Sequence, residues 1–344
     1  MYSFAIVVAA LAAAPSQNKP TKYVLKTEDA KSIVGTVTYD VTSEKAQANE
    51  WVVFAAVAPE LPGQTKVKTV LSPAGTTAAD LSPFARKMLV AHVKVNTATL
   101  KASLPIKITY SATLRSRTLV VLNDGDAAPA VAPLPEKERK LFLTNFGDCD
   151  YSNATFKKWV KVEGLARGAS EAEVDYARRV FLAIKAKFRY EFKLDLDRHA
   201  STVCAAGKSD CGGLATLFVA ALRAHGVPAR TLYGRWAESA KTEDTLNGTK
   251  YLQWHVKAEF FAAGVGWVPV DISGAIQHDK TRAGLEYFGR DKGDFLTFHI
   301  DANVTLDSKI SGKQVLQSLQ RPAYWVRGNG AFEPHTDVED WRVR

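Results

Sequence analysis

The sequence predicts an α+β protein in which an all-β sandwich domain precedes a domain that mixes helices and strands. Two observations support this fold class. β-rich runs separated by turn-forming residues fill the chain from Tyr23 to about Val121. Beyond residue 170 the apolar residues recur at helical spacing, and further strands follow. With 344 residues, the chain is long enough for two domains that each bury a core.

The N-terminal residues have the composition of an export signal. Met1 to Ala14 form an apolar run, and Ala12 and Ala14 fit an Ala-x-Ala cleavage site. The run is too short to be a comfortable membrane-spanning helix. No Lys or Arg precedes it, so the signal is atypical. We expect residues 1–18 to be a signal peptide, and the protein to be exported to the periplasm or beyond without a stable membrane anchor.

The first half reads as short strands. Several alternate apolar with polar residues, and clusters of Pro, Gly, Asp and Ser separate them. The runs cover residues 34–41, 51–57, 88–95, 104–110 and 117–122. Because no helical pattern lies between them, we expect an antiparallel β-sandwich domain over residues 19–125. A Pro- and Ala-rich stretch follows, which predicts a linker over residues 126–140.

The second half predicts a catalytic domain over residues 141–305 and a C-terminal extension over residues 306–344. The spacing of apolar residues predicts a helix over 170–188, with Ser170 as N-cap and Glu173 completing a capping box. A second helix follows Cys211 and ends near Gly226, because Leu214 and the apolar residues after it recur at helical spacing.

Cys211 is the strongest candidate nucleophile. It falls in the first turn of the second helix, where the unpaired backbone N–H groups and the helix dipole favour a thiolate. The same N–H groups are placed to receive the oxyanion of a tetrahedral intermediate. The other two cysteines, Cys149 and Cys204, are either free thiols or one disulfide, since the sequence does not give their separation.

A thiol nucleophile needs a base that a third group holds in place. His255 lies on the polar face of a strand over residues 251–261, and we expect that face to point toward the helices. A short turn leads to Asp271. For Asp271 to stand opposite His255 in an antiparallel hairpin, the loop must be residues 262–264. The spacing permits a Cys–His–Asp triad without requiring it.

Three segments in this order resemble the core of the transglutaminase-like superfamily. They are DCGGLATLF, continuing to LRAHGVPAR, over 210–230, WHVKAEF over 254–260 and GWVPVD over 266–271. The similarity covers about residues 140–300, and the strand-rich first half resembles the β-sandwich that precedes this core in bacterial members. The resemblance implies a papain-like fold, with Cys211 as nucleophile, His255 as base and Asp271 as orienting acid.

The resemblance also implies a second oxyanion donor upstream of the nucleophile, for which Tyr190 and Trp159 are both candidates. The calcium-binding segments of the large animal transglutaminases are not recognisable, so no metal and no cofactor are expected. The resulting hypothesis is a thiol enzyme for acyl transfer at amide bonds, acting on a protein or peptide by hydrolysis, as a protease or amidase, rather than by cross-linking. The alternative is a non-catalytic binding or scaffold module that retains the fold.

The formal net charge of +9 points to anionic partners only in general terms. The 45 Lys and Arg residues are scattered through the chain, and no nucleic-acid motif accompanies them. We therefore expect no nucleic-acid partner, and the sequence leaves the oligomeric state open.

Overall fold

The computed structural model describes residues 22–95, 100–123 and 125–344. The α+β class is confirmed, since six helices and a large share of strand occur in these residues. The expected signal peptide, residues 1–18, lies outside the described part of the chain. Within that part, no helix has both the length and the apolar character needed to cross a membrane.

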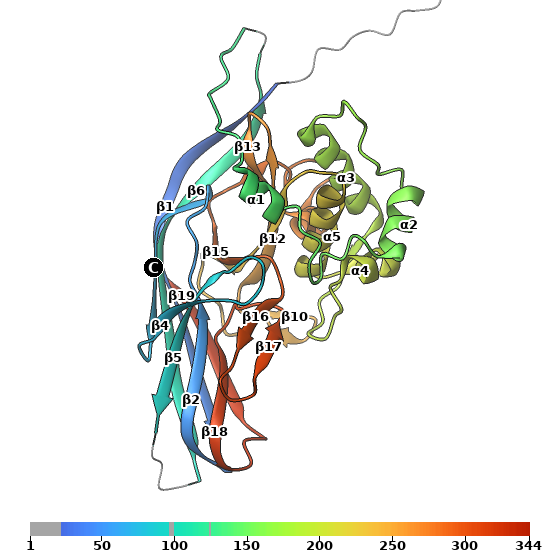
Figure 1. Ribbon diagram of the computed structural model, residues 1–344. Helices are drawn as coiled ribbons and strands as arrows, with labels where there is room; N and C mark the ends of the chain where they lie inside the picture. The colour runs from blue at the N-terminus through green and yellow to red at the C-terminus, as the bar shows by residue number, and fades with distance from the viewer. Residues whose placement is uncertain (1–21, 96–99, 124) are drawn as a thin grey trace, which may run out of the picture.

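The sandwich consists of two antiparallel sheets (Figure 1). Side chains of both sheets form one buried core. The first sheet contains β14 (Arg290–Asp291), β6 (Ala102–Val121), β1 (Tyr23–Ser43) and β19 (Thr336–Val343), with β3 (Gln64–Ser72) also paired to β6. The second contains β18 (Ala323–Gly330), β2 (Ala46–Ala56), β5 (Lys87–Lys94) and β4 (Thr76–Ala79).

The long pair β1–β6 runs along one side of the molecule, from the sandwich to a position beside the second half (Figure 1). Its register extends from Tyr23↔Val121 to Ser43↔Ala102, with a bulge near Asp29. The sequence predicted two separate strands at 104–110 and 117–122. They are one strand because residues 111–116 contain neither Gly nor Pro to break it.

The second half is built on a four-stranded antiparallel sheet that carries helices on one face (Figure 1). In spatial order its strands are β13 (Gly266–Val270), β12 (Trp254–Ala262), β9 (Ala229–Trp236) and β15 (Phe295–Ile300). The helices are α1 (Glu136–Leu141), α2 (Ala154–Val162), α3 (Glu173–Lys187), α4 (Ala200–Ala206), α5 (Cys211–Ala224) and α6 (Ile272–His278). Short pairs complete this half: β7 (Arg189–Tyr190) with β8 (Lys208–Ser209), β10 (Thr245–Leu246) with β11 (Thr249–Lys250), and β16 (Val304–Asp307) with β17 (Lys313–Leu316).

The capping box predicted at Ser170 is wrong. Helix α3 has Ala172 as its N-cap, and no side chain caps it. The Glu171 carboxylate instead accepts hydrogen bonds from the Gly168 N–H and from Arg179, which fixes this segment as a turn ahead of the helix.

The two halves share a core. Phe298 of β15 stacks on Tyr110 of β6, with ring centroids 4.2 Å apart, and contacts Trp341 of β19 edge-on. The C-terminal segment 306–344, expected as an extension, supplies β18 and β19 to the two sheets of the sandwich. This four-stranded sheet of the second half, the central sheet, therefore lies between the helices and the sandwich. Of the predicted linker over residues 126–140, residues 136–140 belong to α1.

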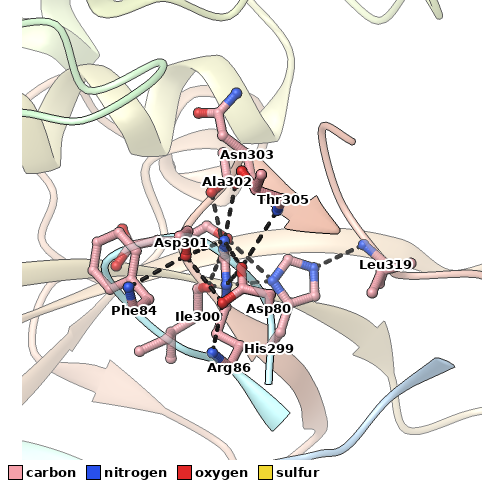
Figure 2. A network of polar contacts seen from close by, with 11 residues as sticks. Asp80, Phe84, Arg86, His299, Ile300, Asp301, Ala302, Asn303, Thr305 and Leu319 are labelled. Atoms are coloured by element: carbon pink, nitrogen blue, oxygen red, sulfur yellow. Dashed lines mark hydrogen bonds and ion pairs between the residues drawn. The ribbon is translucent and has the colours of Figure 1, made fainter. Parts of the chain in front are cut away.

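Arg86 ties the sandwich to the second half through a buried polar network (Figure 2). Its guanidinium pairs with Asp80 and donates to four successive carbonyls, those of residues 300–303. The Asp301 carboxylate in that turn accepts from Arg223, near the end of α5, at 2.8 Å. A side chain just before β5 thus helps to fix the far end of the helix that begins at Cys211.

Candidate active site

Cys211 is the first residue of α5, and Asp210 is the N-cap. The Asp210 carboxylate accepts a hydrogen bond of 3.1 Å from the Gly213 N–H, which satisfies one of the unpaired donors of the first turn. Arg198 holds the same carboxylate, with Nε–O distances of 2.9 and 3.1 Å. Asp210, which caps the helix and pairs with Arg198, therefore fixes the start of α5 and with it Cys211.

The electrostatics at Cys211 differ from the expectation of a lowered thiol pKa. Burial raises the pKa of the Cys211 thiol, and the charge of Asp210 raises it further. The Val256 backbone N–H and Arg198 act in the opposite direction and do not outweigh them. The expectation failed chiefly because the sulfur is buried away from water, and also because the residue that caps the helix is itself an anion beside it.

His255 and Asp271 form a buried hydrogen-bonded pair. The Nε2 atom of His255 lies 2.8 Å from Oδ2 of Asp271. The other carboxylate oxygen of Asp271 accepts from the Gly274 N–H at 2.8 Å and caps α6. Burial opposes ionisation of this carboxyl, but the charge and hydrogen bond of His255 outweigh it and lower the pKa of Asp271 to about 2. Among the described residues, no group hydrogen-bonds Nδ1 of His255.

The hairpin that carries this pair differs by one residue on each strand from the predicted register. Ala262 pairs with Gly266, so the loop is residues 263–265. Pairing stops at Ala258↔Val270, because Asp271 leaves the strand to cap α6. Asp271 is therefore diagonal to His255 rather than opposite it. The shift preserves the face, since side chains alternate with a period of two.

The polar face of β12 does not point toward the helices as expected. Val256, Ala258 and Phe260 on the other face belong to the core formed with α5. On the polar face, Lys257 and Glu259 pair with Asp291 of β14 and Arg117 of β6. The edge of β12 from Trp254 to Lys257 lacks a β13 partner. At this open edge the Val256 N–H reaches the Cys211 sulfur.

The structure separates the two candidates for the second oxyanion donor. The Tyr190 phenol lies near the Cys211 thiol, since burial raises the pKa of Tyr190 and Cys211 raises it further. Its phenol therefore keeps its proton and remains a donor. Trp159 instead packs against Phe156 and Phe188 in the helical core. Of the two, Tyr190 is the one beside the thiol.

Sequence reasoning missed three residues at this site. The Trp236 ring stacks on His255, with centroids 4.6 Å apart and planes at 23°. The Lys257 ammonium lies 4.6 Å from the centroid of the same Trp236 ring. Tyr251 also lies near Cys211, because burial raises the pKa of its phenol and Cys211 raises it further. Only the β9–β12 register, which places Gly234 opposite His255, brings Trp236 to the site, and no local pattern encodes that register.

A hollow of about 420 Å³ adjoins these residues. Its lining includes His255, Asp271, Tyr190, Trp236 and Tyr251. Cys149 and Cys204 lie elsewhere, both free and buried, so the disulfide left open by the sequence is not formed. Burial raises the pKa of each of these two thiols to about 11. In the described ranges, no group of three or more His, Cys, Asp or Glu residues is placed to hold a metal ion.

Residues 161–272 match the profile of the transglutaminase-like superfamily. The chain contains a transglutaminase-like core. The match begins within α2 and ends just after Asp271, so it includes Cys211, His255 and Asp271. No curated protein matches the chain.

The chain is also similar to several solved structures, at low sequence identity and with TM-scores under 0.5. A candidate cysteine protease from Cytophaga hutchinsonii is 11% identical, with a TM-score of 0.49, over 94% of this chain and 100% of that chain. The periplasmic domain of TgpA from Pseudomonas aeruginosa is 13% identical, with a TM-score of 0.36, over 70% of this chain and 92% of that chain. Red sea bream transglutaminase is 11% identical, with a TM-score of 0.32, over 68% of this chain and 49% of that chain.

Proposed function

We propose that this protein is a cysteine-dependent enzyme that hydrolyses amide bonds in peptides or proteins, as a protease or amidase. The observation that carries the proposal is the buried pair of His255 and Asp271 beside Cys211. Asp271 is hydrogen-bonded to Nε2 of the His255 imidazole, which leaves Nδ1 available to take up a proton.

In the proposed reaction, the Cys211 sulfur attacks the carbonyl carbon of the amide while His255 removes the thiol proton. The Tyr190 hydroxyl donates to the developing oxyanion. His255 then delivers its proton to the leaving amine, and a thioester on Cys211 remains. Water, deprotonated by His255, attacks the thioester, which releases the carboxylic acid and restores the thiol. Asp271 holds the imidazole in one orientation and stabilises its charged form.

The surroundings of the thiol favour water over an amine as the second reactant. Exposed charged side chains such as Glu286, Arg290 and Lys292 line the same hollow as His255 and Asp271. Water therefore reaches the imidazole that would activate it, whereas cross-linking needs water to be excluded from the intermediate.

The test is the pH dependence of Cys211 alkylation by iodoacetamide, followed by mass spectrometry of the cysteine-containing peptides. Cys149 and Cys204 serve as internal references, because both are buried thiols with raised pKa values. We expect Cys211 to react first at pH 7, and His255→Ala to slow its labelling by about 10-fold or more. Because burial and Asp210 raise the pKa of this thiol, His255→Ala should need a higher pH to reach the same rate.

Hydrolysis is then measured on peptide and glutamine amides, with Cys211→Ala as the inactive control. If His255→Ala leaves the rate of Cys211 labelling unchanged and no amide is hydrolysed, the result would support the non-catalytic scaffold instead.

A further inference from the structure

Two hollows adjoin each other near Tyr190, the proposed oxyanion donor. The first, of about 420 Å³, contains His255 and Asp271 in its lining, and the second, of about 690 Å³, lies between the end of α3 and the segment after α6. Tyr190 and Gln277 line both hollows. A substrate that extends beyond the scissile bond would therefore pass along the walls of both.

Most of the acids in these walls are neutralised by buried partners. Asp279 pairs with Lys185. Asp291 and Asp294 both face Lys257, and Asp291 also lies near Arg117. Asp271 is hydrogen-bonded to His255. In the described part of the chain, Glu286 is the one acid of these walls without an ion-pair partner.

The exposed cations of the same walls are not neutralised. Five of them have no ion pair or side-chain hydrogen bond to any described residue: Arg189, Lys280, Arg282, Arg290 and Lys292. They come from β7, the segment after α6 and the region of β14, and so surround the approach from several sides. A sixth, Lys187, pairs with Glu163. The walls therefore carry an excess of positive charge that nothing in the described fold neutralises.

We propose that the substrate is a peptide with acidic side chains close to the scissile amide. This inference rests on the proposed function for the reaction, but the charge of the walls is independent of it. Unpaired cations in a hollow raise the local concentration of an anionic ligand and orient it, which acts chiefly on KM and on the association rate. The attraction is between exposed groups, so salt weakens it.

The first experiment compares hydrolysis of matched peptides in which two Glu residues beside the scissile amide are retained, changed to Gln or changed to Lys. We expect kcat/KM to fall in that order, with most of the change in KM, and the differences to shrink at high salt. The double variant Arg290→Glu/Lys292→Glu should reduce the preference for Glu over Gln by about 3- to 10-fold, for charges roughly 10 Å from the substrate.

A matched control is Lys68→Glu/Lys107→Glu. Both lysines are exposed on the first sheet of the sandwich, Lys68 on β3 and Lys107 on β6, and the change in net charge is the same. This variant should keep the full preference. Equal kcat/KM for the Glu and Gln peptides in the unaltered protein, or an equal effect of the two double variants, would overturn the proposal.

The second experiment needs no turnover, so it separates this inference from the proposed function. Cys211 is alkylated with iodoacetate, an anion, and with iodoacetamide, its neutral counterpart. The ratio of the two rates should fall about 3-fold or more in Arg290→Glu/Lys292→Glu and stay unchanged in Lys68→Glu/Lys107→Glu. If the double variant lowers the rate ratio but the protein hydrolyses no amide, the positively charged walls are supported and the proposed reaction is rejected. If the protein hydrolyses amides but the double variant leaves the ratio unchanged, the reaction is supported and the preference for acidic peptides is rejected.

Discussion

The carboxylate of Asp271 serves two hydrogen-bonding partners at once. One oxygen contacts Nε2 of His255, and the other caps α6 through the Gly274 N–H. Gly274 is needed for this arrangement, because a Cβ there would lie 2.8 Å from the Tyr287 ring and 2.9 Å from the Asp271 carboxyl carbon. The same residue thus links the local fold of the chain to the orientation of the imidazole.

This double role predicts a pH-dependent contribution to stability. The pKa of Asp271 is lowered to about 2 in the folded protein, from an ordinary value of 3.8. A carboxyl whose pKa is lower in the folded protein stabilises the fold at pH values above its pKa in the unfolded chain. This stabilisation disappears as the pH falls through the pKa of the folded protein. We expect about 2 kcal/mol to be lost between pH 4 and pH 2.

The measurement is urea unfolding of the unaltered protein and of Asp271→Asn between pH 2 and pH 6. Other carboxylates titrate in both proteins, so their contributions cancel in the difference. That difference should shrink toward low pH. A difference that stays constant across the range would show that the His255 contact does not stabilise the ionised form.

At the scale of single elements, the start of α5 depends on two neighbouring glycines that are not equivalent. A Cβ at Gly213 would lie 2.1 Å from Oγ and 2.8 Å from Cβ of the buried Ser209. A Cβ at Gly212 would first meet the Arg198 side chain, at 3.2 Å. Ser209 cannot move aside in its strand, whereas the long Arg198 side chain can.

We therefore expect Gly213→Ala to destabilise the protein by about 1–3 kcal/mol, because the overlap outweighs the roughly 1 kcal/mol by which Ala is favoured over Gly in a helix. Gly212→Ala should change the free energy of unfolding by less than about 1 kcal/mol. Urea denaturation of the two variants gives the comparison, and equal effects would contradict the packing at Ser209.

At the scale of the whole molecule, the sandwich and the transglutaminase-like core are joined by a continuous interior. Phe298 and Leu296 of the central sheet are buried with Tyr110 and Trp341 of the sandwich. Arg235 of β9 is fully buried between the halves and pairs with Glu339 of β19. An ion pair in such a place leaves a buried charge if either partner is separated. The sandwich is therefore part of what holds the site together.

Phe298→Ala should destabilise both halves together, by about 3–5 kcal/mol, since it removes a buried aromatic ring from the shared core. Thermal unfolding followed by tryptophan fluorescence and by the accessibility of Cys211 should give one coincident transition, shifted to lower temperature. Val70→Ala is the control, because Val70 is 48% exposed on β3. Two separate transitions would show that the halves unfold independently.

The sequence by itself determined the fold class, the helix that begins at Cys211, and the identity of His255 and Asp271 as candidates. These features depend on local periodicity, caps and short segments of fixed spacing, which a linear sequence records directly. It misjudged the capping of α3, the hairpin register and the direction in which the pKa of the Cys211 thiol is shifted. Each of these depends on burial or on a neighbour such as Glu171 or Asp210, which only the folded arrangement sets.

Only the tertiary structure decided between Tyr190 and Trp159, placed Trp236 against His255, and gave β18 and β19 to the sandwich. The net positive charge of the walls of the two hollows is likewise visible only in the tertiary structure. Its cations come from segments about 100 residues apart in sequence, and whether an acid neutralises each one depends on distance. Pairing across strands and the cancellation of charge are long-range properties, so they follow from the folded arrangement and not from any single stretch of the chain.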